Sequence, residues 1–139
     1  DTEGKAAIGH GYTYSGHPVG AAAAIACINE TLRLNVKDNA AVRGQQLFEG
    51  LQKLYDDFDV IGDVRGGHGL MCALELVSDR ETKKPIDKAT PVKLQKAAYE
   101  SGAMIRVSGP NVILSPPLIV TSQYVDTILA ALRLGFQSL

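Results

Sequence analysis

The sequence has little of what marks several specialised classes of protein. It contains no tryptophan and only two cysteines, and its formal net charge is -1. A nearly neutral chain has no electrostatic basis for binding nucleic acid or an anionic membrane surface. No apolar run approaches the roughly 20 residues of a membrane span, and the N-terminus shows no basic-then-apolar signal pattern. We therefore expect a cytoplasmic protein whose partners are neither nucleic acid nor membrane.

The cysteines and histidines form no pattern of a disulfide or a metal site. Cys27 and Cys72 both lie among apolar neighbours, which is typical of buried free thiols. Metal ligands need a characteristic spacing, and it is missing among the three histidines, His10, His17 and His68. The sequence predicts neither a disulfide nor a metal site.

Length and composition fit a single domain with its own core. The chain has 139 residues, of which 45% are hydrophobic and 21% are charged, as is usual for globular domains. It begins with Asp1 rather than Met, and we expect it to be an incomplete part of a longer protein. An exposed apolar patch, or a partner chain that covers one, is the expected consequence.

Apolar residues recur with helical spacing in four segments. Pro18 can begin a helix without losing a needed N–H, and it opens a segment that reaches about residue 35. In this segment the residues that share a face and are expected to point inward are Ile25, Ile28 and Leu32. A second helix is expected over about residues 38–56, separated from the first by a break or a bend. Asn35 or Asp38 is available to cap it.

Two more helices follow later in the chain. Thr90-Pro91 begins one that reaches about Ser101, and Gly102 ends it. Thr121 caps the last one. The expected inward stripes of the three later helices are Gly44, Leu47, Phe48, Leu51 and Tyr55 in the first, Leu94, Ala97 and Ala98 in the second, and Val125, Ile128, Leu129, Leu132 and Phe136 in the third.

Between these helices the pattern changes to that of strands. Residues 60–65 and 70–77 are expected to form an antiparallel hairpin around a glycine-rich turn. Residues 79–88 are polar and are expected to form a loop, and short extended pieces are expected at 103–107 and 112–115. The sequence therefore predicts an α+β fold, in which helices pack on a small, mostly antiparallel sheet.

Two segments carry candidate binding residues. In Gly9-His10-Gly11-Tyr12-Thr13-Tyr14-Ser15-Gly16-His17-Pro18, a glycine-rich loop leads into a helix. There the Thr13 hydroxyl and backbone N–H groups are suited to a phosphate, although a short strand with a solvated or capping Thr13 is the alternative. Arg106 lies among apolar residues, and its guanidinium is suited to a carboxylate. The alternative is an edge-strand arginine that extends into solvent.

The first of these segments, continued by Val19-Gly20-Ala21-Ala22-Ala23-Ala24, closely resembles one in class III aminotransferases, which are pyridoxal-phosphate enzymes of fold type I. The resemblance implies that Thr13 reaches across a homodimer interface to the 5'-phosphate of the neighbouring subunit's cofactor, with Tyr12 beside that phosphate. Tyr14, Ser15 and His17 match as well, and we assign them to loop geometry and interface packing.

The segment around Arg106, with Leu114-Ser115-Pro116-Pro117-Leu118-Ile119, resembles the end of omega-amino-acid–pyruvate aminotransferases. The resemblance implies that Arg106 binds the carboxylate of the amino acid or keto acid. The family commonly has Gly-Asp after this arginine, whereas this chain has Gly109-Pro110-Asn111. Arg65, which precedes a glycine-rich turn, matches a family stretch and is expected to be a structural arginine of the hairpin.

The resemblance also implies that this chain is only the C-terminal portion of a longer enzyme and lacks part of its site. The lysine that forms a Schiff base with the cofactor lies upstream of Thr13 in the family, and Lys5 is too close to Thr13 to be its counterpart. Residues 1–36 would end the large cofactor domain, and residues 37–139 would form the C-terminal small domain. The parent would move an amino group from an amine or omega-amino acid to a keto acid such as pyruvate. The chain by itself would be inactive.

Two other functions remain open at this stage. The parent could be an aminomutase or a decarboxylase of the same family, against which the setting of Arg106 argues mildly. The chain could also be a non-catalytic domain that binds a phosphate ligand or a protein partner. The missing Met and the apolar helix that follows Pro18 argue against that.

Overall fold

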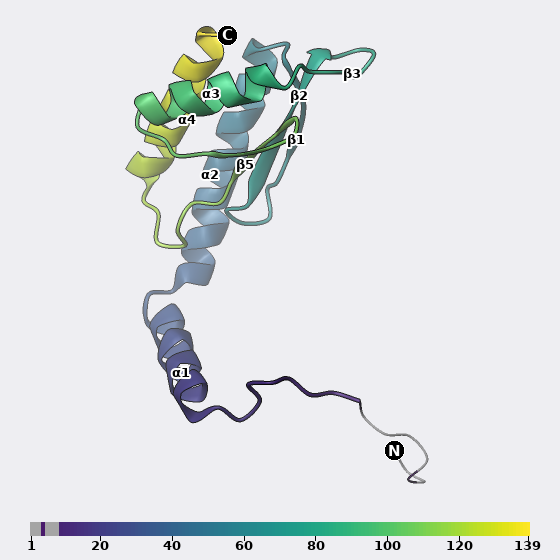
Figure 1. Ribbon diagram of the computed structural model, residues 1–139. Helices are drawn as coiled ribbons and strands as arrows, with labels where there is room; N and C mark the ends of the chain where they lie inside the picture. Colours follow the sequence, from purple (N-terminus) through teal and green to yellow (C-terminus); the bar gives the residue numbers. More distant parts are fainter. Residues whose placement is uncertain (1–3, 5–8) are drawn as a thin grey trace. The chain divides into compact units, whose positions relative to one another are not determined.

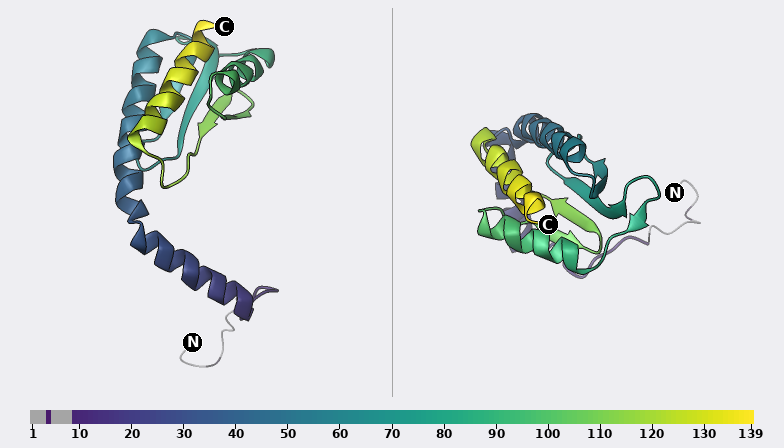
Figure 2. Two further views of the ribbon diagram at one scale, coloured as in Figure 1. Left: turned by 90° about the vertical axis from the view of Figure 1, so that its left-hand side faces the viewer. Right: turned by 90° about the horizontal axis from the view of Figure 1, so that it is seen from above.

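The computed structural model describes residue 4 and residues 9–139 (Figures 1 and 2). The chain divides into two compact units, residues 1–34 and residues 35–139. Lys5, which is too close to Thr13 to match the family's Schiff-base lysine, lies outside the described residues.

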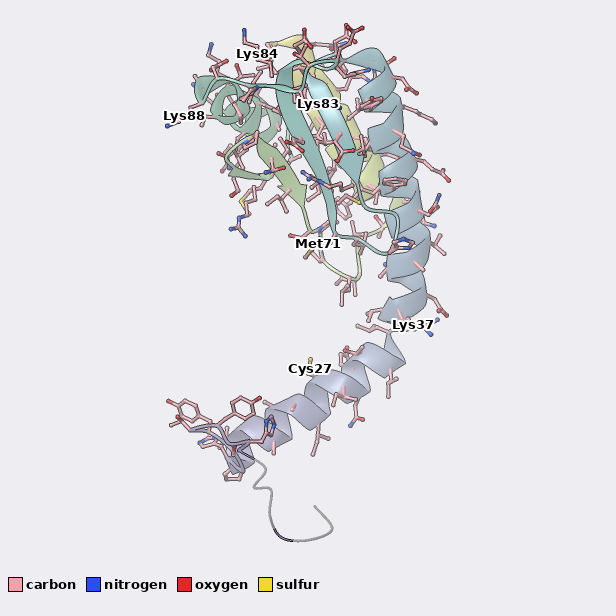
Figure 3. The ribbon with its side chains drawn as sticks, turned by 90° about the vertical axis from the view of Figure 1, so that its right-hand side faces the viewer. Cys27, Lys37, Met71, Lys83, Lys84 and Lys88 are labelled. Carbon is pink, nitrogen blue, oxygen red and sulfur yellow. The ribbon has the colours of Figure 1, made fainter. Side chains whose placement is uncertain are left out.

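The described residues of the first unit contain one helix, α1 (Pro18–Arg33), with Pro18 at its first position as the sequence predicts. None of its residues is buried. Ile25, Ile28 and Leu32, expected to point inward, are 58–73% exposed. Cys27 is exposed as well, so its expected burial is wrong (Figure 3). The stripe is amphipathic as predicted, but burial needs a second apolar surface, which a single helix does not provide.

The second unit begins with α2 (Val36–Asp57). A break, rather than a bend, separates the two helices, because Asn35 adopts the left-handed conformation with φ 47°. Its side chain caps no backbone N–H and instead donates a hydrogen bond to Asp38 (2.8 Å). The buried positions of α2 confirm the predicted stripe at Gly44, Leu47 and Leu51, while Phe48 and Tyr55 are half-buried.

The sheet is antiparallel throughout. Its strands are β1 (Ile61–Arg65), β2 (Cys72–Asp79), β3 (Lys84–Pro85), β4 (Arg106–Ser108) and β5 (Asn111–Leu114). Their order is β1-β2-β5-β4, and β3 pairs with β2 alone. The predicted α+β fold is thus confirmed. The expected loop at 79–88 is wrong in one detail, because Lys84 and Pro85 within it form β3 and pair with Asp79 and Val77.

Two helices complete the second unit. α3 (Ala89–Glu100) begins beside Asp87, whose carboxylate accepts hydrogen bonds from its first two backbone N–H groups (2.8 and 3.0 Å). It ends at Glu100, and Gly102, two residues later, has a φ of 98° and so takes the conformation that favours glycine. α4 (Ser122–Gln137) begins at Thr121, whose side chain accepts from the N–H of Tyr124, as predicted.

The core of the second unit lies between the sheet and these helices. In the right-hand view of Figure 2, α4 lies between α2 and α3. Alternate residues of β2 and β5 are buried in one cluster with apolar residues of all three helices. The residues of β2 and β5 that point toward this core are Cys72, Leu74, Leu76, Val112 and Leu114, and Ile61 of β1 joins them. The residues between them, Ala73, Glu75 and Ile113, lie on the opposite face of the sheet, where their partners on β1 and β4 are the charged residues Asp63, Arg65 and Arg106.

Candidate functional site

Thr13 lies in a tight turn rather than in a strand. The Ser15 N–H donates to the Tyr12 carbonyl oxygen (3.0 Å), and the Tyr12 N–H donates to the Ser15 hydroxyl (3.1 Å). Thr13 and Tyr14 thus occupy the two central positions of the turn, and the hydroxyl of Thr13 is on an exposed residue. Tyr12 is 71% exposed, and its ring lies edge-on to that of His10 (5.0 Å between centroids). The short-strand alternative is therefore wrong.

His17 has a role that sequence reasoning missed. It is the N-cap of α1, and its Nδ1 atom accepts a hydrogen bond from the Gly20 N–H (3.1 Å). A side-chain acceptor directly before a proline-initiated helix was the available signal. The cap fixes the direction in which the Thr13 turn enters the helix.

The chemistry of this turn fits a phosphate group. It offers hydroxyl and N–H donors just before a helix N-terminus, where the helix dipole favours an anion. The first turn of α1 contains no acidic residue. Residues 9–29 contain no aspartate or glutamate, so a phosphate would meet no carboxylate from this stretch of the chain.

Arg106 lies at the edge of the sheet in the second unit. It is the first residue of β4, and it pairs with Ile113 of β5. The register continues this row through Ala73 of β2 to Arg65 of β1 on the face away from the helices. Arg106 is exposed, and within residues 9–139 its guanidinium has no hydrogen bond or ion pair. This position agrees with the edge-strand alternative and leaves the guanidinium free to meet an anion.

An open hollow of about 680 Å³ adjoins Arg106. Most of its walls are apolar, and they come from the segment before β4, from β5, and from the Ser115-Pro116-Pro117 segment that follows β5. A guanidinium beside an apolar hollow suits a small molecule with a carboxylate at one end and a hydrocarbon body.

The turn after β4 is a two-residue hairpin connection. Gly109 and Pro110 lie between the paired residues Ser108 and Asn111, and Gly109 has a φ of 59°. The Pro110 carbonyl oxygen accepts a hydrogen bond from the Leu76 N–H (2.9 Å). The departure from the family's Gly-Asp therefore still produces a tight, well-bonded turn.

Arg65 is the last residue of β1, and its guanidinium crosses the outer face of the sheet. It donates a hydrogen bond to the Oδ1 atom of Asn111. It also lies 3.4 Å from a carboxylate oxygen of Glu75 and 3.7 Å from one of Asp63. A structural role for Arg65 was predicted, but these partners were not, because 46 residues separate Arg65 from Asn111 and no local pattern joins them.

Of the two candidate residues, Thr13 belongs to the first unit and Arg106 to the second. Among the described residues, no group of three or more histidine, cysteine, aspartate or glutamate side chains could hold a metal ion. None of the helices in this part of the chain has both the length and the apolar character to cross a membrane.

Known proteins resemble the chain along most of its length. A family model for class III aminotransferases matches residues 3–134. The uncharacterized aminotransferase y4uB of Sinorhizobium fredii is 41% identical over 128 residues, which is 89% of this chain and 27% of that protein. The taurine–pyruvate aminotransferase of Bilophila wadsworthia is 37% identical over 131 residues, which is 89% of this chain and 28% of that protein.

A solved structure shows the same likeness. The amine transaminase from an uncultivated Pseudomonas species, crystallised in a PLP-bound form, superposes with a TM-score of 0.86 at 43% sequence identity. The match covers 94% of this chain and 30% of that one. This chain thus spans less than a third of the length of each of the three proteins. On the match of residues 3–134, the chain belongs to the class III aminotransferases.

Proposed function

We propose that the full-length protein is a pyridoxal-phosphate-dependent transaminase that moves an amino group from an amine or omega-amino acid to a keto acid such as pyruvate. The observation that carries this proposal is Arg106. It is exposed on the edge strand, it has no partner within residues 9–139, and it borders an apolar hollow. The names of the relatives support the reaction class, since two of them are transaminases of amine substrates.

The cofactor would supply the electron sink and amino-group carrier that transamination needs. Thr13 would hold its phosphate, with the hydroxyl donating to a phosphate oxygen and Tyr12 lying beside the group. We propose that the cofactor so held belongs to the other subunit of a homodimer. The lysine that would bind it covalently lies outside this chain, so the chain alone would be inactive.

Arg106 would bind the substrate carboxylate. Two guanidinium N–H groups can donate to the two carboxylate oxygens at once, which fixes the acid in orientation as well as in place. The apolar walls of the hollow would contact the hydrocarbon part of the acid. An amine without a carboxylate has no use for this contact, so the two substrates of the cycle would depend on Arg106 to different degrees.

We further propose that residues 1–36 end the large cofactor domain of the parent and that residues 37–139 form its small domain. The division of the chain into compact units falls close to this boundary, between residues 34 and 35. It lies at the break before α2, where Asn35 takes the left-handed conformation.

The test is the visible absorption spectrum of the full-length protein with pyridoxal phosphate. An added omega-amine should remove the cofactor's visible band, and pyruvate should then restore it. A band that amines leave unchanged would contradict transamination and favour an aminomutase or decarboxylase of the same family. A protein that develops no cofactor band would contradict both and leave a non-catalytic binding domain.

A further inference from the structure

We propose that Arg65 and Asn111 are positioning residues for Arg106: together they hold the β4–β5 hairpin in the orientation that presents its guanidinium to the substrate carboxylate. This inference rests on the carboxylate-binding role proposed for Arg106. It adds that two residues on other strands orient the Arg106 side chain for this role.

The hairpin needs such support because β4 is short and lies at the edge. It has three residues, Arg106 to Ser108, and pairs only with β5. No strand or helix fixes its other side by backbone pairing in the described chain. Gln95 of α3 donates to the carbonyl oxygen of Ile105, just before β4 (2.9 Å). The direction of Arg106 depends on this contact at one end of the strand and, at the turn end, on how firmly β4 is fixed to β5 and the rest of the sheet.

Asn111 joins the two strands at the end where the turn lies. It pairs with Ser108 across the two-residue turn. Its Nδ2 atom also donates to the Ser108 carbonyl oxygen (3.3 Å). Its Oδ1 atom faces the other way and accepts from Arg65. One amide side chain thus connects the last residue of β4 to a side chain on β1.

Arg65 can reach Asn111 because of its neighbours on the same face. Directly opposite it on β2 is Ala73, a small residue that leaves room for the arginine to cross. Next to Ala73 on that face is Glu75, which pairs with Asn111. The guanidinium therefore lies diagonally over β2 and contacts Asn111, Glu75 and Asp63. These contacts tie β1, β2 and β5 together on one face.

The same arginine has an electrostatic effect on the face it shares with Arg106. Asp63 and Glu75 are paired residues on that face, and both are about half exposed. Without Arg65, two neighbouring carboxylates would stand unbalanced there and would repel an incoming carboxylate substrate. Arg65 offsets their charge as well as holding the hairpin.

The experiment uses the full-length protein with its cofactor, and it measures KM for pyruvate and, separately, for an amine that lacks a carboxylate. The variants are Asn111→Ala and Arg65→Gln. Each should raise KM for pyruvate roughly three- to tenfold, which is the change expected from one hydrogen bond, and should leave KM for the amine within about twofold.

The matched control is Arg133→Gln. Arg133 forms a similarly exposed ion pair with Asp57 (2.6 Å) and lies on α4, away from the hairpin. Its loss should leave KM for pyruvate unchanged. Hydrogen–deuterium exchange gives a readout other than activity. Peptides that cover residues 104–114 should exchange faster in Asn111→Ala and Arg65→Gln, and at the original rate in Arg133→Gln.

Combination with Arg106→Ala separates the two proposals. If Arg106→Ala reduces the use of pyruvate selectively, and neither hairpin variant raises KM for pyruvate, the positioning role is wrong while the proposed function stands. If Arg106→Ala affects pyruvate and the amine equally, the carboxylate role itself is wrong. In the Arg106→Ala background, Asn111→Ala should change KM for pyruvate no further, and an added effect there would overturn positioning through Arg106.

Discussion

Gly44 of α2 lies directly against the backbone of Gly69, in the segment that joins β1 to β2. A Cβ atom on Gly44 would stand 2.3 Å from the Gly69 carbonyl oxygen, which is closer than any real contact of this kind. Backbone atoms cannot swing aside as a side chain can. The helix and this glycine-rich segment therefore approach as closely as they do only because position 44 has no side chain.

We predict that Gly44→Ala destabilises the fold, although alanine is the better helix former at an unstrained site. The gain in helix propensity is about 0.5–1 kcal/mol, and the cost of forcing a methyl group into a packed contact is about 1–3 kcal/mol. The free energy of unfolding, measured in urea, should therefore fall. Gln45→Ala, at the exposed neighbouring position, is the control. A higher free energy of unfolding for Gly44→Ala would show that the contact can relax.

Arg80 holds the segment that connects α2 to β1 by hydrogen bonds to its backbone. Its guanidinium donates to the carbonyl oxygens of Tyr55 (2.6 Å), Phe58 (2.7 Å) and Ile61 (3.0 Å). It also lies over the Tyr55 ring, 4.0 Å from the centroid. The last carbonyl groups of a helix have no partner within it, and Arg80 supplies one to the end of α2.

We predict that Arg80→Ala lowers the free energy of unfolding by about 1.5–3 kcal/mol, the range for losing hydrogen bonds to a charged group. Thermal and urea unfolding would measure it. Lys96→Ala, which removes an exposed ion pair with Glu100, should cost less than about 0.5 kcal/mol. Equal effects of the two substitutions would mean that Arg80 is only another surface charge.

Asp87 makes the stability of the start of α3 dependent on pH. Hydrogen bonds from the Thr90 hydroxyl, and from the N–H groups of Ala89 and Thr90, lower the pKa of this carboxyl below its ordinary value of 3.8. A lowered pKa in the folded state means that the stabilisation is complete above the ordinary value. It is lost as the pH falls through the lower, folded-state value.

We therefore predict that Asp87→Ala lowers the melting temperature at neutral pH, and that its difference from wild type shrinks as the pH falls below 3.8. Asp87→Asn keeps an acceptor at the cap but does not titrate in this range. Its melting temperature relative to Asp87→Ala should be independent of pH. A difference between wild type and Asp87→Ala that stays constant down to the lowest pH would contradict this account.

The elements of the second unit could be predicted because their signals are local. Apolar spacing located α2, α3 and α4, and Thr121 and Gly102 marked a start and an end that the structure confirms. The hairpin of β1 and β2 followed from two strand-like segments joined by a glycine-rich turn. Each of these signals lies within the element that it predicts.

What could not be predicted depends on contacts between distant residues. Helical spacing in α1 showed which residues share a face, but not whether anything covers that face, so the burial of Cys27 was wrong. The segment after β2 looked like a polar loop, yet Arg80 in it holds the end of α2. Arg65 and Asn111 meet only because β1 and β5 both pair with β2.

The role proposed for Thr13 predicts a loss of cofactor affinity. Thr13→Ala removes a hydroxyl that would donate to the phosphate, and a hydrogen bond to a charged group is worth about 1.5–3 kcal/mol. The full-length variant should bind pyridoxal phosphate roughly 10- to 100-fold more weakly in a fluorescence titration. Thr13→Ser keeps the hydroxyl and should retain most of the affinity. Unchanged binding by Thr13→Ala would remove this residue from the cofactor site.

The role proposed for Arg106 predicts a split between two kinds of substrate. Arg106→Ala removes a two-point contact that only a carboxylate can use, so kcat/KM for pyruvate should fall roughly tenfold or more. The half-reaction with an amine that lacks a carboxylate should change far less. Arg106→Lys keeps the charge but cannot donate in the same forked geometry. Its kcat/KM for pyruvate should therefore lie between those of the wild type and Arg106→Ala. Stopped-flow measurement of each half-reaction separates these effects, and equal losses in both would rule out carboxylate recognition by Arg106.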